Sequence, residues 1–126
     1  MRSKVLTMAV VVLAVSAGLS SAAAAMPGPA NTTVTIRAQG TDLSGVVSSP
    51  APLRCSQNRR VDVYKQIGTR GGGNDIRFAN DTASLQGNAY KWSTGNTGTP
   101  GRFYAKVWPK TGCRGDTSVT IQVVNT

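Results

Sequence analysis

The stretch RFYAKVWPKTGCRGDTSVTIQVV (residues 102–124) decides the fold class of this chain. From 102 to 108 every second residue is apolar on one side, at Phe103, Ala105 and Val107, and residues 118–124 repeat the alternation. This period of two is typical of half-buried antiparallel strands. The intervening KTGCRGD contains residues that favour turns. The stretch therefore predicts a β-hairpin with one face of each strand in a core.

Five further segments show the same alternation, and turn-rich sequence separates them. They cover residues 33–38, 43–49, 60–66, 75–80 and 88–93. We expect Tyr90 and Trp92 of the last of these to lie in the core. The 126-residue chain contains no Glu and many Gly, Thr, Ser and Val residues, which favours strands over helices. Seven short strands in about 100 residues predict an all-β, immunoglobulin-like antiparallel β-sandwich, with a small barrel as the alternative.

The first residues have the three parts of a secretory signal peptide. Arg2 and Lys4 form a basic start, residues 5–19 are almost entirely apolar, and Ala23 and Ala25 fit the small-x-small cleavage rule. The apolar run is shorter than the roughly 20 residues of a membrane span, and a retained N-terminal anchor is the alternative. We expect a signal peptide at 1–25, a flexible segment at 26–32 and the sandwich domain at 33–126. The expected location is extracellular or in the cell envelope.

The chain has two cysteines, Cys55 and Cys113. In an exported protein the default expectation is a disulfide, with two free thiols as the alternative. Closing the loop between them would contribute about 4 kcal/mol by chain-entropy reasoning. Cys55 precedes the third expected strand and Cys113 lies in the last hairpin. The bridge should therefore join two loops at one end of the sandwich.

The chain is strongly basic, with 14 Lys and Arg residues and five Asp residues. Two of these cations lie in the expected signal peptide, so the mature domain would carry 12 cations and a net charge of +7. The disulfide would gather cations into a basic rim that attracts anionic polymers, membrane surfaces or nucleic acid. A solvated surface that aids solubility is the alternative. The candidate anion-binding residues are Arg54, Arg59, Arg60, Lys110 and Arg114.

Aromatic residues offer a second candidate site. With Phe103, Ala105 and Val107 in the core, Tyr104 and Trp108 would face outward on either side of Lys106. Exposed aromatic rings in a row on a sheet can grip sugar rings, so Tyr104 and Trp108 are candidate glycan-binding residues. The alternative is that Trp108 packs at the edge of the core or under the disulfide hairpin.

Catalytic and metal-binding chemistry is poorly represented. The chain has no His, and nothing marks Asp62, Asp75 or Asp81 as a catalytic pair. GTRGGGND (68–75) lacks the Lys-Ser/Thr ending of a phosphate loop, and NDIRFAND (74–81) lacks the alternating acids of a calcium loop. We therefore expect a protein that is not an enzyme and that uses no metal or cofactor.

Several of these segments together resemble a group of small secreted actinobacterial proteins of uncharacterised function. The matching residues are Cys55, residues 59–65, Gly87, Tyr90, Trp92, residues 101–107, Cys113, Asp116 and Ser118. That group is similar to the transthyretin-like and carboxypeptidase-regulatory-like β-sandwiches, which share a G-x-[FY]-x-A-x-V strand. The resemblance spans residues 33–124 and implies fold, disulfide and export, but no activity. The glycine-rich turn at 69–74 departs from it.

Arg114, Gly115 and Asp116 spell the tripeptide that integrins recognise. We interpret it as a turn, because Gly permits the bend and Asp can bond its own backbone before the last strand.

These observations predict a secreted binding or structural module whose basic, disulfide-braced end contacts anionic cell-wall or extracellular polymers. A glycan-binding sandwich that uses Tyr104 and Trp108 is one alternative. A small-molecule or inhibitor-type sandwich is another.

Overall fold

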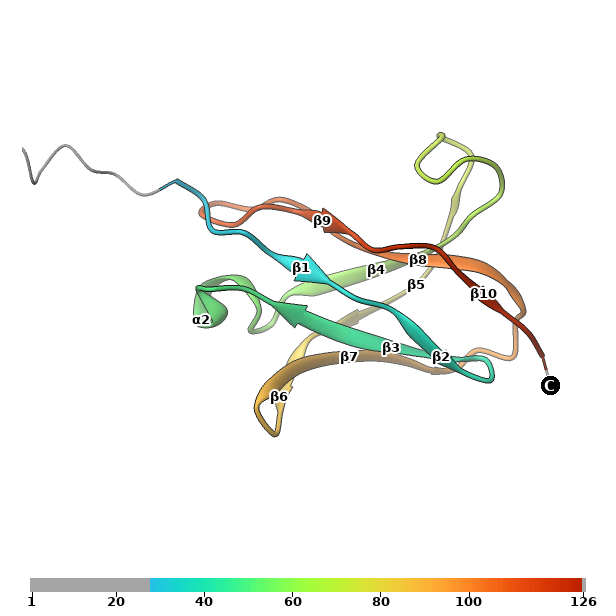
Figure 1. Cartoon of the computed structure of the whole chain (residues 1–126), viewed down its shortest axis with the longest axis horizontal. Helices are drawn as coiled ribbons and strands as arrows, with labels where there is room; N and C mark the ends of the chain where they lie inside the picture. The colour runs from blue at the N-terminus through green and yellow to red at the C-terminus, as the bar shows by residue number, and fades with distance from the viewer. Residues whose placement is uncertain (1–27, 126) are drawn as a thin grey trace, which may run out of the picture.

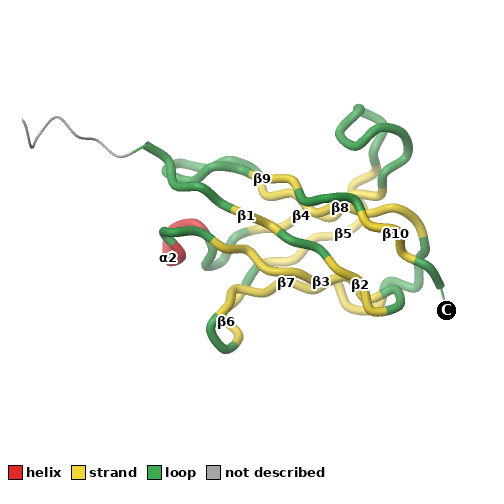
Figure 2. Tube along the Cα trace, viewed as in Figure 1, coloured by secondary structure: helices red, strands yellow, loops and turns green. Residues whose placement is uncertain are grey.

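The computed structural model describes residues 28–125, which form two antiparallel sheets that face each other (Figure 1). The first sheet contains β1 (Thr33–Val34), β2 (Arg37–Gln39), β3 (Asp42–Ser48), β6 (Ser84–Gln86) and β7 (Ala89–Asn96). The second contains β4 (Arg60–Lys65), β5 (Ile76–Thr82), β8 (Gly101–Val107), β9 (Asp116–Thr117) and β10 (Ile121–Val123). A single-turn helix, α2 (Pro52–Cys55), lies between β3 and β4 (Figure 2).

Two pairs of these segments are interrupted strands, so the ten segments form eight strands, which are the seven that the sequence predicts and β6, which it does not predict. β1 and β2 both pair with β3, and β9 and β10 both pair with β8. β5 pairs with β4, and β6 then pairs with β7 in the opposite sheet. The change of sheet occurs at Ala83, which is fully buried. The resulting order, β1/2-β3-β7-β6 against β9/10-β8-β4-β5, matches the immunoglobulin plan. The predicted sandwich is confirmed, and the barrel alternative is wrong.

The core lies between the sheets and follows the predicted alternation in β8, but not at Ile76 and Val119, which are exposed. Phe103, Ala105 and Val107 are completely buried, and Trp92 is 1% exposed. Tyr90, which the sequence also places in the core, is only half-buried and packs against it.

The backbone at Thr35 lies close to Trp92 and to Gly45. The Trp92 Nε1 donates a hydrogen bond to the Thr35 carbonyl at 3.1 Å. A Cβ at Gly45, on the neighbouring strand, would lie 1.9 Å from that same carbonyl oxygen. Gly45 therefore has to be glycine for β3 to pass beneath the break between β1 and β2.

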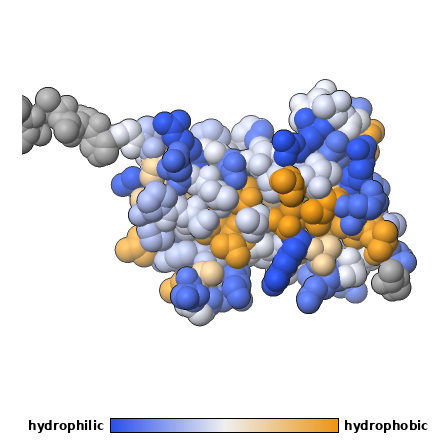
Figure 3. Space-filling model, viewed as in Figure 1, coloured by the Kyte–Doolittle hydropathy of each residue, from blue (hydrophilic) through white to orange (hydrophobic). Residues whose placement is uncertain are grey.

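The surface is uneven in polarity. Figure 3 shows mostly hydrophilic residues at the end where the described chain begins and an apolar band toward β2 and β10.

Within residues 28–125 there is no helix with the length and apolar character of a membrane span. The predicted signal peptide (1–25) lies outside the described residues.

Candidate functional site

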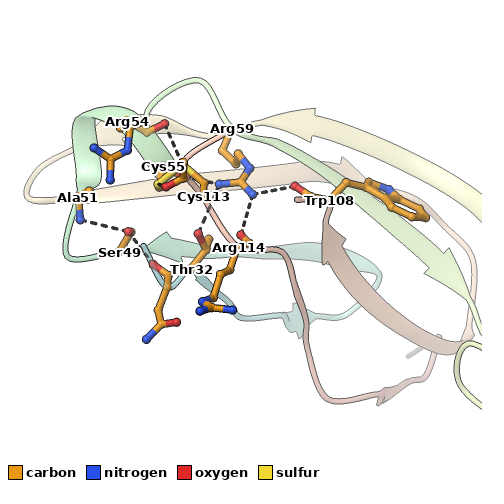
Figure 4. Close-up of a disulfide and its surroundings, with 11 residues drawn as sticks. Thr32, Ser49, Ala51, Arg54, Cys55, Arg59, Trp108, Cys113 and Arg114 are labelled. Carbon is orange, nitrogen blue, oxygen red and sulfur yellow. Dashed lines mark hydrogen bonds between the residues drawn. A yellow bond between two sulfur atoms is a disulfide. The ribbon is translucent and has the colours of Figure 1, made fainter. Parts of the chain in front are cut away.

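The disulfide joins Cys55, at the end of α2, to Cys113, in the loop between β8 and β9 (Figure 4). The two Cα atoms are 5.5 Å apart, and both residues are buried. This confirms the predicted bridge and its position, since it joins two loops at one end of the sandwich. We call this region the disulfide end, defined by residues 28–32, 51–59 and 108–115.

The loop that carries Cys113 is also tied to the start of the described chain. The Ala30 N–H donates to the Gly112 carbonyl at 3.0 Å, and the Ala30 carbonyl accepts from the Arg114 N–H at 2.8 Å. The Asn31 carbonyl accepts from the Ser49 hydroxyl. The expected flexible segment 26–32 is therefore anchored in its described part at Ala30 and Asn31.

Arg59 does not belong to the basic rim, and this part of the prediction is wrong. Its side chain is only 3% exposed. The guanidinium donates to the carbonyl oxygens of Cys55 at 2.8 Å, Trp108 at 2.7 Å and Arg114 at 2.9 Å (Figure 4). Burial lowers the pKa of this guanidinium from its usual value. Arg59 is therefore an internal brace, because it holds three loop carbonyls that would otherwise lack partners.

Three of the predicted cations do gather at the surface of the disulfide end. Arg54, Lys110 and Arg114 are exposed and line one hollow of about 790 Å³, whose remaining walls are residues 28–29, 109, 111–113 and 115. Gly112 has a φ of +80°, which favours glycine, and a Cβ there would lie 3.1 Å from the Arg54 Nε. We call Arg54, Lys110 and Arg114 the basic rim.

The fourth exposed cation, Arg60, lines a smaller hollow next to the basic rim. This hollow, of about 290 Å³, is bordered by Asn58, Arg59, Arg60, Trp108, Pro109 and Lys110. Lys110 and Pro109 border both hollows. The positive surface therefore continues from the basic rim toward Arg60 and Trp108.

None of the five carboxylates forms an ion pair with the basic rim, and each of them accepts a hydrogen bond inside the domain. Their partners are the Ser93 hydroxyl for Asp42, Arg60 for Asp62, Tyr104 for Asp75, the Ser93 N–H for Asp81 and the Val34 N–H for Asp116. Among residues 28–125, ion pairs form only from Arg60 and Arg77, both to Asp62. The basic rim is thus left without acidic partners.

The carboxylate of Asp62 organises a cluster that sequence reasoning missed. Asp62 is 1% exposed although it lies on the outer face of β4, away from the core. Its oxygens lie 2.9 Å from the Arg60 Nε and 3.6 Å from the Arg77 Nη1, and Trp108 donates its Nε1–H at 3.0 Å. The available signal was an acid between Val61 and Val63 in a strand, where Asp is uncommon.

Tyr104 is not the exposed aromatic that the alternation predicts. It faces away from the core as expected, yet it is only 3% exposed. Its ring stacks on Tyr64 with centroids 5.4 Å apart, and its hydroxyl donates to Asp75 at 2.5 Å. Burial, followed by this hydrogen bond, raises the pKa of Tyr104 to about 12, and the same bond lowers the pKa of Asp75. Tyr104 therefore cannot form a sugar-binding row with Trp108.

The Arg114, Gly115 and Asp116 tripeptide is built into the fold. The Asp116 carboxylate accepts from the Val34 N–H of β1 at 2.8 Å. This partner is distant in sequence, so the expected bond to the local turn is replaced by a bond between strands. A Cβ at Gly115 would lie 2.8 Å from the Val107 carbonyl oxygen. Gly115 thus allows the loop to pass close to the end of β8.

The bond from Asp116 makes a testable contribution to stability. We expect Asp116→Ala to lower the free energy of unfolding by about 1–2 kcal/mol, because the Val34 N–H loses its acceptor next to a buried side chain. Urea denaturation measures the change. Asp42→Ala is the matched control and should have a smaller effect, since its contact with Ser93 is exposed and 3.4 Å long. Equal stabilities of Asp116→Ala and the parent protein would refute the structural role.

Comparisons with known proteins add no assignment. No protein-family model matches the chain, and the search of curated proteins finds no similar sequence. The resemblance to secreted actinobacterial sandwiches therefore stays a prediction. In the described residues, no group of three or more His, Cys, Asp or Glu side chains could hold a metal ion.

Proposed function

We propose that this protein is an exported, non-enzymatic module that binds anionic polymers of the cell envelope or extracellular space at its disulfide end. One observation carries the proposal. The exposed side chains of Arg54, Lys110 and Arg114 surround one hollow of about 790 Å³, and no acid of residues 28–125 pairs with them. Converging cations without counter-ions concentrate positive potential and attract polyanions.

The rigidity of the disulfide end supports the same function. The disulfide, the Arg59 bonds and the Ala30 bonds all hold the loop that presents Lys110 and Arg114. A loop that is already ordered loses little conformational entropy when it binds, so more of the contact energy appears as affinity. The disulfide also fits an oxidising compartment, in line with the predicted signal peptide.

The alternatives have weaker support. A neutral-glycan site built on two aromatics loses Tyr104, which is buried. An integrin ligand would need the Asp116 carboxylate, which accepts a bond from β1. No observation favours an inhibitor or small-molecule carrier over the polymer-binding function. Nucleic acid is a polyanion too and is included among the probes below.

Salt dependence tests the proposal. For wild-type protein and inorganic polyphosphate, the logarithm of the association constant from calorimetry should fall linearly with the logarithm of salt concentration. Replacing Arg54, Lys110 and Arg114 together by Gln should reduce that slope by about 2, because each cation releases a fraction of a counter-ion. The matched control replaces Arg37, Lys91 and Arg102, three exposed cations outside the basic rim, by Gln.

The control separates local recognition from net charge. Both triple variants remove three charges, so equal losses would mean that binding follows total charge and that the basic rim has no special part. Absence of polyphosphate, polyuronate and nucleic-acid binding at low salt would refute the function altogether.

A further inference from the structure

Trp108 is an exposed aromatic side chain whose position is fixed. Its indole is 49% exposed, which is unusual for the only Trp of the domain outside the core. The Nε1–H is held by the buried Asp62 carboxylate at 3.0 Å, and the Lys106 Nζ lies 3.7 Å from the ring centroid. The hydrogen bond anchors one edge of the ring, and the Lys106 ammonium lies over the centre of one of its two faces, so a ligand would stack on the opposite face. An aromatic surface held in place loses little side-chain entropy on binding.

Trp108 borders the smaller hollow together with two exposed cations. Arg60 and Lys110 line the same space of about 290 Å³, and Asn58 contributes an amide. Arg60 uses its Nε for Asp62, and its side chain remains 57% exposed. This Trp108 hollow therefore combines an apolar ring, two positive groups and a hydrogen-bonding amide.

We propose that the Trp108 hollow binds one sugar ring of an acidic polysaccharide, with the indole against the ring and with Arg60 and Lys110 at its carboxylate. This inference rests on the proposed function and specifies its ligand class. The C–H face of a sugar ring offers apolar contact to the indole, which a ring-free phosphate chain cannot. The guanidinium fork of Arg60 suits a planar carboxylate. The neighbouring basic rim, which shares Lys110, would contact the following acidic units of the same polymer.

Single-stranded nucleic acid fits the described surface less well. Such ligands need several aromatic platforms on which successive bases stack. Of the seven aromatic side chains, all of which lie in residues 28–125, only Trp108 is exposed. Phe103, Tyr104 and Trp92 are buried, and Tyr64, Tyr90 and Phe78 are partly buried. A single exposed ring can stack on one sugar unit, but it cannot stack on several successive bases.

The experiment compares four probes: polygalacturonate fragments, inorganic polyphosphate, neutral dextran and oligothymidylate. Trp108→Ala should weaken binding of polygalacturonate by about tenfold, the scale of a lost central aromatic contact, and should leave polyphosphate binding unchanged. Trp108→Phe, which keeps a ring but loses the bond to Asp62, should retain most of the affinity. Leu53→Ala removes a 74% exposed apolar side chain of the same end and serves as the matched control.

The outcomes separate this inference from the proposed function. Equal weakening of polygalacturonate and polyphosphate by Trp108→Ala, or no weakening of either, overturns the sugar contact while the polyphosphate salt dependence still supports the basic rim. Oligothymidylate or dextran binding that depends on Trp108 as strongly as polygalacturonate binding also overturns it. Absence of binding to every polyanion defeats both proposals.

Intrinsic fluorescence gives a readout that needs no variant. Trp92 is 1% exposed and Trp108 is 49% exposed, so acrylamide should quench mainly Trp108. Saturating polygalacturonate should protect the wild-type protein from this quenching, whereas polyphosphate should protect it less. Unchanged quenching with bound polygalacturonate would overturn the inference even if Trp108→Ala failed to fold.

Discussion

Replacing Arg59 by Ala is expected to lower the free energy of unfolding by about 3–5 kcal/mol, because it removes three hydrogen bonds from a charged donor, each of which contributes roughly 1.5 kcal/mol or more. The guanidinium is 3% exposed and donates to the carbonyls of Cys55, Trp108 and Arg114. Without it, those carbonyls remain enclosed and lose their donors, and the removed side chain leaves a cavity. Urea denaturation followed by circular dichroism measures the change.

Two further variants show whether the geometry of the guanidinium matters. Arg59→Lys keeps the charge but replaces a planar fork by a single ammonium, so it should recover only part of the loss. The neighbouring Arg60→Ala breaks an ion pair from a side chain that is 57% exposed and should cost about 1 kcal/mol or less. Similar effects of the Arg59→Ala and Arg60→Ala changes would contradict the assigned role of Arg59.

Loss of the disulfide is the second large effect. The double variant Cys55→Ala/Cys113→Ala should be less stable by about 4 kcal/mol, because the unfolded chain is no longer closed over a separation of 58 residues. The loss of local stability should be largest at the disulfide end. Amide hydrogen exchange at Gly112 and Arg114 should therefore accelerate more than exchange in β8.

Reduction of the wild-type protein is the control for the cavity that two alanines leave. Reduced and doubly substituted proteins should melt at similar temperatures, both well below the oxidised protein. If complete reduction, verified by mass, left the melting temperature unchanged, the bridge would have no part in holding this end together. Arg59→Ala combined with the double variant should lose less than the sum of the two effects, since both act on the same loops.

The strand pattern and the disulfide could be read from the sequence because both are local or unambiguous. Alternation placed Phe103, Ala105 and Val107 in the core, and two cysteines allow only one intramolecular pairing. The interruptions within the outer strands could not be read in this way. They depend on which strand each segment pairs with. The short strand β6 could not be predicted either, because it forms only where the chain changes sheet at Ala83.

Residues whose environment is made by distant segments were predicted poorly. The alternation correctly predicted that Tyr104 faces away from the core. It did not predict the contacts with Tyr64 and Asp75 that bury the side chain. Arg59 and Arg60 look equivalent in sequence, yet Arg59 is enclosed by carbonyls from α2 and from the 108–115 loop, whereas Arg60 is exposed. Asp116 bonds Val34, 82 positions away, where a local turn bond was expected.

Binding at the disulfide end is the central claim, and amide chemical-shift mapping of the exported domain tests it most directly. Titration with polygalacturonate at low salt should shift the amides of residues 54, 60 and 108–115, and the shifts should shrink when salt is added. The amides around Arg37 and Lys91, on the first sheet, should stay unperturbed. Shifts that centre on those two residues, or that spread evenly over all exposed cations, would contradict the account.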